Sequence, residues 1–249
     1  DGETTLQEPV PSRDHTELML RAMGAELQTE GNRITLTPKD TPLSPIDMSV
    51  PGDISSAAFW LTAGAIHPNA RVRVVDCGIN PTRSGIIDAL KMMGARLTIE
   101  NQRIESGEPV ADLCIESSLL RGTTIQGEII PRLIDEIPVL AVAAMAAQGT
   151  TVITGAWELR VKESDRITTT VKELSRLGGR IEGLPDGIVI KGGRGPVGGK
   201  CHSHNDHRLA MALGVAALIA RGETIIDGAE AVDMSYPSFW QDMERLSER

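Results

Sequence analysis

The stretch that decides the fold is Asp135-Glu-Ile-Pro-Val-Leu-Ala-Val-Ala-Ala-Met-Ala-Ala-Gln-Gly149, with the β-branched run Thr151-Val-Ile-Thr154 close behind it. Helical spacing puts apolar residues on every side of this stretch, which is typical of a helix buried on all its faces. A β-branched run after a glycine favours a strand. The same order recurs in helices that begin at Asp53 and Asp206, which lead into strands at residues 72–75 and 224–226. We predict three buried helices, each followed by a strand.

A second, amphipathic helix type also recurs three times. Its copies occupy Arg13–Gly24, Asn80–Gly94 and Glu163–Gly178, and each precedes an alternating strand such as Ala95–Glu100. Recurrence at intervals of roughly 70 to 85 residues is typical of repeated units that share one core. The predicted fold class is therefore α/β, with internal pseudo-threefold repetition around a helical core.

The beginning of the sequence does not match the beginning of a repeat. The first amphipathic helix has no buried helix before it, and the chain starts at Asp1 rather than at methionine. We therefore expect the sequence to be part of a longer protein, with the partner of this helix encoded upstream.

Composition limits the function classes. The 249 residues are 41% hydrophobic and 24% charged, which allows a large core, and neither an apolar run of membrane-spanning length nor an export signal is present. The net charge of −9 disfavours nucleic acid and anionic membranes as partners. Three widely spaced cysteines indicate neither a disulfide framework nor a structural zinc site. We expect a cytoplasmic protein with reduced thiols.

Charged residues gather at the predicted helix starts. Aspartates there have an ordinary interpretation as helix caps. Arginines do not, because their charge opposes the positive end of the helix dipole unless an anion lies between them. Arg13, Arg83, Arg166 and Arg208 all occupy such positions. In an acidic chain they favour a surface that binds phosphate and carboxylate groups, although each alone is compatible with a solvated arginine.

Two further clusters allow chemistry. Lys162 and Glu163 are adjacent in a charged stretch between a strand and a helix, and they offer an anion contact beside a proton-transfer group. A solvated loop is the alternative. The run Cys201-His-Ser-His-Asn-Asp-His207 contains metal-ligand types, but no second group with zinc spacing accompanies it, so we predict no metal.

Four motifs resemble a known family along essentially the whole chain. They are Gly52-Asp-Ile-Ser-Ser-Ala-Ala-Phe59, Ile129-Ile-Pro-Arg-Leu-Ile-Asp-Glu-Ile-Pro138, Arg160-Val-Lys-Glu-Ser-Asp-Arg166 and Asn205-Asp-His-Arg208. In order and spacing they resemble the 5-enolpyruvylshikimate-3-phosphate (EPSP) synthases. The resemblance implies an enolpyruvyl transferase fold, an inside-out α/β barrel of two lobes, each with three βαβαββ units. Residues 1–49 would be the tail of the N-terminal lobe and 50–249 the C-terminal lobe.

The resemblance also implies an activity. Family members transfer the enolpyruvyl group of phosphoenolpyruvate to the 5-hydroxyl of shikimate 3-phosphate and release phosphate, in the biosynthesis of chorismate and aromatic amino acids. They need no metal or organic cofactor. The expected partners are these two small anions and the missing N-terminal half of the same enzyme, and the complete enzyme is expected to be a monomer. The chain alone is expected to be inactive, because other phosphate-holding loops belong to that half.

Site residues follow from the matched motifs. The implied catalytic pair is Asp135, which holds and deprotonates the 5-hydroxyl, and Glu163, which carries the proton at the methylene carbon. The implied contacts with shikimate 3-phosphate are Arg13, Asp135 and Lys162, and those with phosphoenolpyruvate are Arg166, His207 and Arg208.

The sequence also carries subgroup features. Arg13-Asp-His-Thr-Glu17 and Asn80-Pro-Thr-Arg83 resemble the class II subgroup, which is often tolerant of glyphosate. Met234 stands where some members have a lysine against phosphoenolpyruvate.

Two alternatives remain at this point. One is the enolpyruvyl transferase that acts on UDP-N-acetylglucosamine, which shares the fold and the donor; the Arg160–Arg166 stretch argues against it. The other is a non-catalytic lobe that binds anions without turnover.

Overall fold

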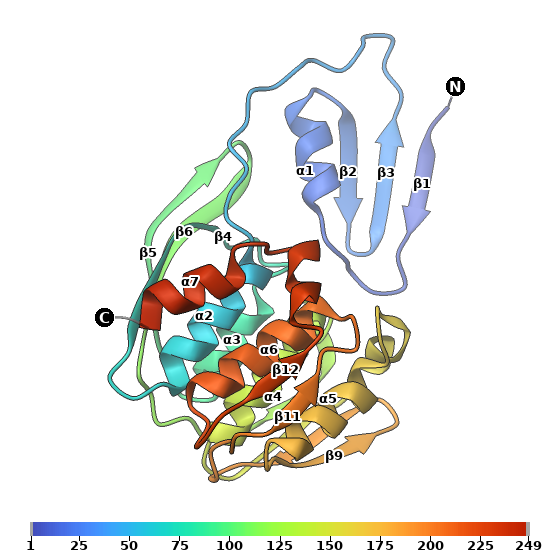
Figure 1. Ribbon diagram of the computed structural model, residues 1–249. Helices are drawn as coiled ribbons and strands as arrows, with labels where there is room; N and C mark the ends of the chain where they lie inside the picture. Colours follow the sequence, from blue (N-terminus) through green and yellow to red (C-terminus); the bar gives the residue numbers. More distant parts are fainter. Residues whose placement is uncertain (1, 248–249) are drawn as a thin grey trace.

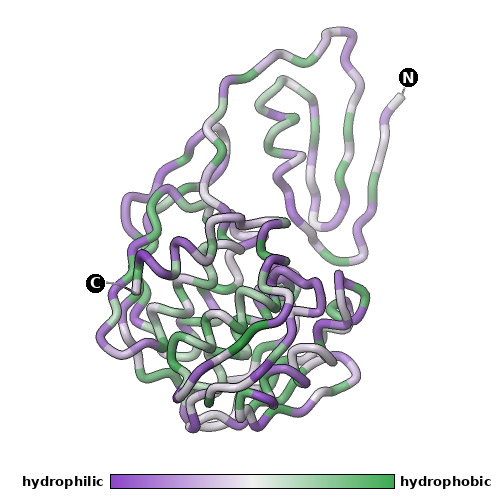
Figure 2. Tube along the Cα trace, viewed as in Figure 1, coloured by the Kyte–Doolittle hydropathy of each residue, from purple (hydrophilic) through white to green (hydrophobic). Residues whose placement is uncertain are grey.

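The three predicted buried helices lie side by side at the centre of the larger part of the molecule. The computed structural model describes residues 2–247. Helices α2 (Ile54–Ile66), α4 (Ile137–Ala146) and α6 (His207–Leu218) contact one another pairwise, and most of their side chains are buried. Figure 2 shows these central helices largely in the colours of apolar residues. The prediction of a shared helical core is confirmed.

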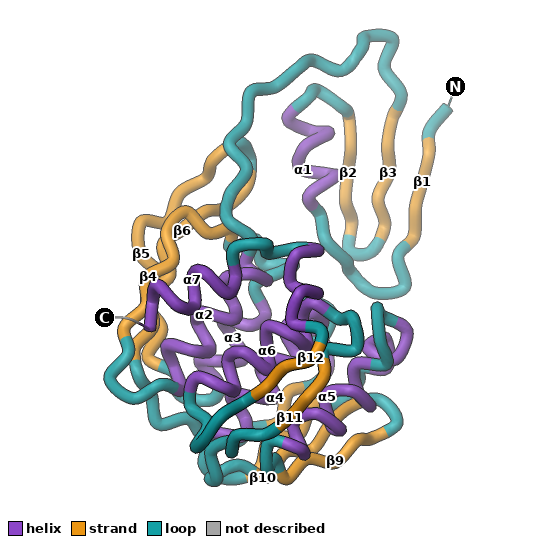
Figure 3. The backbone as a smooth tube through the Cα atoms, in the orientation of Figure 1, coloured by secondary structure: helices purple, strands orange, loops and turns teal. Residues whose placement is uncertain are grey.

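Sheets and amphipathic helices surround this core (Figures 1 and 3). The first repeat continues from α2 through β4 (Arg71–Gly78), α3 (Gly85–Met92), β5 (Arg96–Glu105) and β6 (Glu108–Glu116). Its strands form an antiparallel sheet of order β4-β6-β5.

The second repeat has the same order of elements around α4. It contains β7 (Thr124–Ile125), η1 (Gly127–Ile129), η2 (Ile134–Glu136), β8 (Thr150–Ile153), η3 (Trp157–Val161), α5 (Arg166–Arg176), β9 (Arg180–Leu184) and β10 (Gly187–Lys191). The sheet order is β7-β8-β10-β9, with β7 parallel to β8. Both repeats thus run from a buried helix through a strand and an amphipathic helix to a hairpin of two strands.

The third repeat departs from the pattern. Strands β11 (Lys200–His202) and β12 (Ile225–Asp227) flank α6 and pair in parallel. They are followed by η4 (Ala229–Met234) and by the amphipathic α7 (Phe239–Ser247), whereas the first two repeats end on a hairpin. Trp240 and Met243 of α7 approach Gly214 so closely that a Cβ there would lie 2.8 Å from the indole of Trp240. The last helix thus covers part of the core.

The first amphipathic helix lies outside this body. Helix α1 (His15–Ala22) packs on a sheet of order β1-β3-β2, formed by β1 (Thr4–Gln7), β2 (Glu26–Glu30) and β3 (Arg33–Thr37). We call these four elements the N-terminal sheet unit. None of the side chains in them is buried. Figure 1 shows the unit set apart from the helical core, to which a long segment connects it. Only α3 and α5 of the three amphipathic helices therefore flank the core.

Two glycines lie at equivalent places in the second and third repeats, where one backbone segment crosses another at close range. The N–H of Gly122 donates to the carbonyl of Gln148 (2.7 Å), and that of Gly198 donates to the carbonyl of Arg221 (2.9 Å). A Cβ at Gly198 would lie 2.2 Å from the carbonyl oxygen of Glu223, and one at Gly122 equally close to backbone atoms of Thr150. Neither crossing has room for a side chain.

Within residues 2–247, no helix is both long enough and apolar enough to cross a membrane.

Candidate active site

The buried helices bring their N-terminal ends together, and the predicted site residues lie there. Asp53 and Asp206 cap α2 and α6, since each carboxylate accepts two backbone N–H groups of the first turn. Asp165 caps α5 through the N–H of Thr168 (3.1 Å). The capping interpretation therefore holds for these three aspartates.

Asp135 is different, because it makes no cap. It lies in η2, just before α4, and no backbone N–H at the start of α4 is bonded to a side chain. Its carboxylate instead accepts from Arg13 (2.6 Å) and from Arg166 (3.1 Å). Arg208 approaches it to 3.7 Å and Lys162 to 3.9 Å. Four cations from three segments thus surround one carboxylate.

The cations control the ionisation of Asp135. Burial by itself raises the pKa of this carboxyl, but Arg208, Arg13 and Lys162 outweigh burial and bring the pKa to about 2. Asp135 is therefore ionised at neutral pH. With the cations unoccupied, so low a pKa makes Asp135 a weak base; it can take a proton from a substrate hydroxyl once bound anions offset the charge of those cations.

Glu163 reaches the same cluster through Arg166. Its carboxylate accepts from Nη2 of Arg166 (2.5 Å), while Nε of that arginine donates to Asp206 (2.8 Å). The side chain of Arg166 is only 1% exposed, whereas that of Glu163 is 38% exposed. Every guanidinium nitrogen of Arg166 therefore has a carboxylate partner, and Glu163 is the partner that solvent reaches.

The remaining predicted residues line the same region. Lys162 pairs with Glu158 and faces Asp135. His207 begins α6 and is nearly buried; among the described residues its Nδ1 has no hydrogen-bond partner. Burial and the charge of Arg208 lower the pKa of His207, so its ring is neutral at physiological pH. Arg208 keeps both terminal nitrogens at 3.7 Å from carboxylates, and so retains capacity to donate to an anion.

Arg83 does not join this cluster. It lies in the turn before α3 and donates to the capping carboxylate of Asp53 (3.1 Å) and to the hydroxyl of Ser55 (2.6 Å). The interpretation of Arg83 as an anion-binding arginine is not supported by this geometry, because its head group is already bonded within the protein.

Glu136 is a residue of the site to which the sequence analysis gave no role. Its side chain is 4% exposed, and its Oε1 lies 3.7 Å from Arg208 and has no hydrogen-bond partner in the described part of the chain. Burial is the main reason that the pKa of Glu136 is raised. Two consecutive carboxyl groups thus have pKa values pushed in opposite directions. The signal in the sequence was a second acid directly after Asp135, at the start of an otherwise apolar helix.

Side chains of the Cys201–His207 run have partners within the protein. Cys201 is buried with its thiol toward the carbonyl of Ile225 (3.5 Å), and burial raises the thiol pKa to about 11. In the range 2–247, no three histidine, cysteine, aspartate or glutamate side chains converge on a point that would hold a metal.

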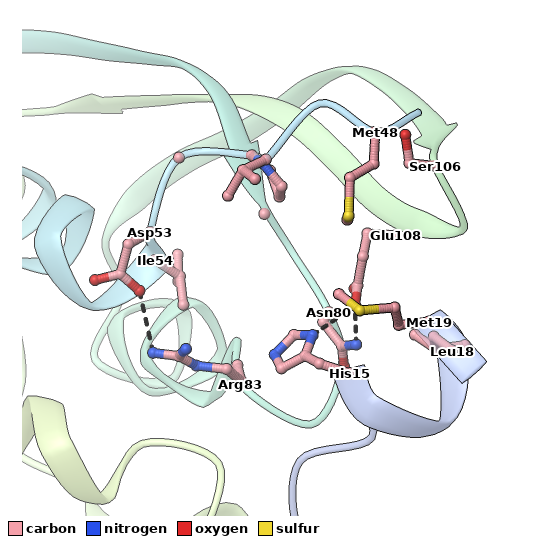
Figure 4. A pocket seen from close by; sticks show the side chains of 14 residues that line it. His15, Leu18, Met19, Met48, Asp53, Ile54, Asn80, Arg83, Ser106 and Glu108 are labelled. Atoms are coloured by element: carbon pink, nitrogen blue, oxygen red, sulfur yellow. Dashed lines mark hydrogen bonds and ion pairs between the residues drawn. The ribbon is translucent and has the colours of Figure 1, made fainter. Parts of the chain in front are cut away.

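A cavity of about 300 Å³ lies beside the site, between α1 and the segment that connects the N-terminal sheet unit to α2. Figure 4 shows His15, Met19, Met48 and Glu108 around it. None of the seven predicted site residues lines it. The cavity therefore belongs to the junction between the two parts of the molecule.

Known proteins resemble this chain over its whole length. The family model for EPSP synthase (3-phosphoshikimate 1-carboxyvinyltransferase) matches residues 1–243. The chain is 52% identical to the 3-phosphoshikimate 1-carboxyvinyltransferase of Herpetosiphon aurantiacus and 51% identical to that of Roseiflexus castenholzii. Each alignment covers 100% of this chain and 58% of the relative. The chain thus spans less than two thirds of the length of these relatives.

Solved structures agree with the fold. An EPSP synthase from Acinetobacter baumannii superposes with a TM-score of 0.94 at 46% identity, over 99% of this chain and 57% of that one. The enolpyruvyl transferase NikO from Streptomyces tendae superposes over 99% of this chain and 56% of its own, with a TM-score of 0.76 at 22% identity, which supports the fold alone. The predicted enolpyruvyl transferase-like fold is confirmed.

Proposed function

The chain belongs to the EPSP synthase family, and we propose that it supplies the acid–base half of the active site in a full-length 3-phosphoshikimate 1-carboxyvinyltransferase. That enzyme transfers the enolpyruvyl group of phosphoenolpyruvate to the 5-hydroxyl of shikimate 3-phosphate and releases phosphate. The observation that carries the proposal is the Asp135 carboxylate, ionised and surrounded by Arg13, Lys162, Arg166 and Arg208.

The proposed chemistry uses the two carboxylates in turn. Asp135 accepts the proton of the 5-hydroxyl as its oxygen attacks C2 of phosphoenolpyruvate, while Glu163 delivers a proton to the methylene carbon. Glu163, left ionised by that step, then takes a proton back from the resulting methyl carbon, and the electron pair of this C–H bond restores the double bond as the C–O bond to phosphate breaks. The cations balance the charge of both substrates, which is the largest electrostatic demand of the reaction. Arg13 and Lys162 are assigned to shikimate 3-phosphate, and Arg166, His207 and Arg208 to phosphoenolpyruvate.

We place the division between lobes at residues 49 and 50. Two features support this position: the N-terminal sheet unit ends at Thr37, and the helical core begins with α2. On this proposal the upstream half of the full-length, monomeric enzyme completes the N-terminal lobe and brings further groups to the substrates. The chain alone would leave the substrates without reactive geometry. As a step in the synthesis of chorismate, the reaction belongs to the cytoplasm.

The test is phosphate release from shikimate 3-phosphate and phosphoenolpyruvate by the full-length protein, by this chain, and by this chain mixed with the upstream half. Turnover is expected from the first and the third. UDP-N-acetylglucosamine is the competing acceptor, and its preferential consumption would overturn the assignment. In the full-length protein, Asp135→Ala should lower kcat by about 10²- to 10⁴-fold, the usual contribution of a general base. Retention of more than about a tenth of kcat would remove Asp135 from that role.

A further inference from the structure

Glu173, far from the proposed reacting groups, is a completely buried carboxylate. It lies two turns along α5 from Arg166, and its side chain is 0% exposed. Burial of a charge is unfavourable unless hydrogen bonds compensate it. Four contacts do so here. Arg176 donates to both oxygens (3.1 and 2.9 Å), the backbone N–H of His202 to one (3.0 Å), and Nε2 of His204 lies 2.8 Å from the other.

Two of these contacts come from the segment that leads into α6. His204 and Asn205 both have left-handed backbone conformations, with φ of +56° and +57°. Such conformations are unfavourable for residues other than glycine, and two in succession persist only where the surroundings hold them. The segment ends at Asp206, which caps α6 and presents His207 and Arg208 to the proposed site. The shape of this turn therefore sets where those two side chains lie.

Helix α5 contacts the segment from His202 to Asp206 at two points along its length. At the site, Arg166 donates to Asp206 (2.8 Å). Two turns away, Glu173 binds the two histidines at the other end of the segment. The strained turn is thus fixed on both sides by the same helix, with one attachment inside the proposed site and the other outside it. Only the outer attachment can be removed without touching a group assigned to substrate.

We infer that Glu173 is a positioning residue, which holds the turn at His204 and Asn205 so that the start of α6 presents Arg208 toward the carboxylate or phosphate of phosphoenolpyruvate. The consequence for binding rests on the proposed function. The consequence for the turn does not, because it follows from the contacts of Glu173 alone. Without the contacts of Glu173 the turn becomes mobile, so Arg208 must be ordered when the anion binds. Ordering costs free energy, and the affinity for the anion therefore falls.

The test compares two variants that each remove one donor from the same carboxylate. His204→Asn keeps a residue type that tolerates the left-handed backbone but is too short to reach Glu173. Arg176→Met removes the other charged donor, which does not belong to the turn, and serves as the matched control. In the full-length protein, His204→Asn should raise KM for phosphoenolpyruvate roughly five- to tenfold, equivalent to about 1 to 1.4 kcal/mol, and leave KM for shikimate 3-phosphate within about twofold. Arg176→Met should leave both constants nearly unchanged.

A second readout does not depend on turnover. Amide hydrogen exchange at Arg208 and Leu209, whose N–H groups donate to Asp206, should become faster in His204→Asn and not in Arg176→Met. Glu173→Gln should change both readouts in the same direction as His204→Asn, with folding checked by circular dichroism. Equal effects of the two donor variants, or no change in exchange, would overturn the inference. If the wild-type protein lacks turnover while exchange responds as described, the proposed function fails and the positioning of the turn stands.

Discussion

Replacement of Asp135 by asparagine tests the electrostatics of the site through the stability of the chain. Asparagine has nearly the shape of the protonated aspartate, so the variant lacks only the ionised form. The pKa of Asp135 falls from 3.8 to about 2 on folding. Because the folded pKa is depressed, the ionised carboxylate stabilises the native state above pH 3.8, and this contribution is lost as pH falls toward 2. The lowering of the pKa corresponds to about 2 kcal/mol at neutral pH.

Urea denaturation at pH 7, 5 and 3 measures this contribution as the difference between wild type and Asp135→Asn. We expect about 2 kcal/mol at pH 7 and pH 5, and about 1 kcal/mol at pH 3, where the carboxylate is already partly protonated in the unfolded chain. Asp88→Asn is the control, since Asp88 makes a half-exposed pair with Arg132 and should contribute under about 1 kcal/mol. A difference that stays constant with pH would show that the loss comes from packing and not from the charge of Asp135, because a packing defect does not titrate.

Two further substitutions test the proposed contact of Arg208 with phosphoenolpyruvate and the close backbone approach at Gly198. Arg208→Lys in the full-length protein keeps the charge but loses the planar pair of donors. It should raise KM for phosphoenolpyruvate by about tenfold, with little change in KM for shikimate 3-phosphate. An unchanged KM for phosphoenolpyruvate would show that Arg208 does not bind it. Gly198→Ala should lower the free energy of unfolding by roughly 1 to 3 kcal/mol, because its Cβ would overlap a backbone carbonyl, whereas Gly195→Ala, with open space around it, should have almost no effect. Equal midpoints for the two alanine variants in thermal melts would show that the crossing at Gly198 has more room than its contacts indicate.

The helical core was predictable because its signal is strong and local. A helix such as α4 is apolar on all its sides, and periodicity alone separates it from the amphipathic α5. The third repeat, in which η4 and α7 follow β12, was not predictable in the same way. Nothing in the α7 sequence shows that Trp240 packs against Gly214, since that contact depends on the two helices meeting in space.

The site was only partly predictable, for an electrostatic reason. Sequence indicates which cations lie at helix starts, but not whether their head groups are free. Arg83 and Arg166 have similar positions in the sequence, yet the first binds the cap of α2 and the second is buried among three carboxylates. The raised pKa of Glu136 also required the fold, because it results from burial, which the sequence does not show.

In this chain without its proposed upstream half, the N-terminal sheet unit has no buried side chains, and this has a consequence for ligand affinity. Elements without a core of their own open locally at little cost in free energy, and such segments are the first to be cut by proteases. Arg13 lies in the loop that joins β1 to α1 in this unit, and its bond to Asp135 is one of the links between the unit and the rest of the molecule. A ligand that bridges these two residues must fix the unit in place, so part of its binding energy is consumed in ordering protein. By the same linkage, the bound ligand should protect residues 4–37 from proteolysis more than it protects the core.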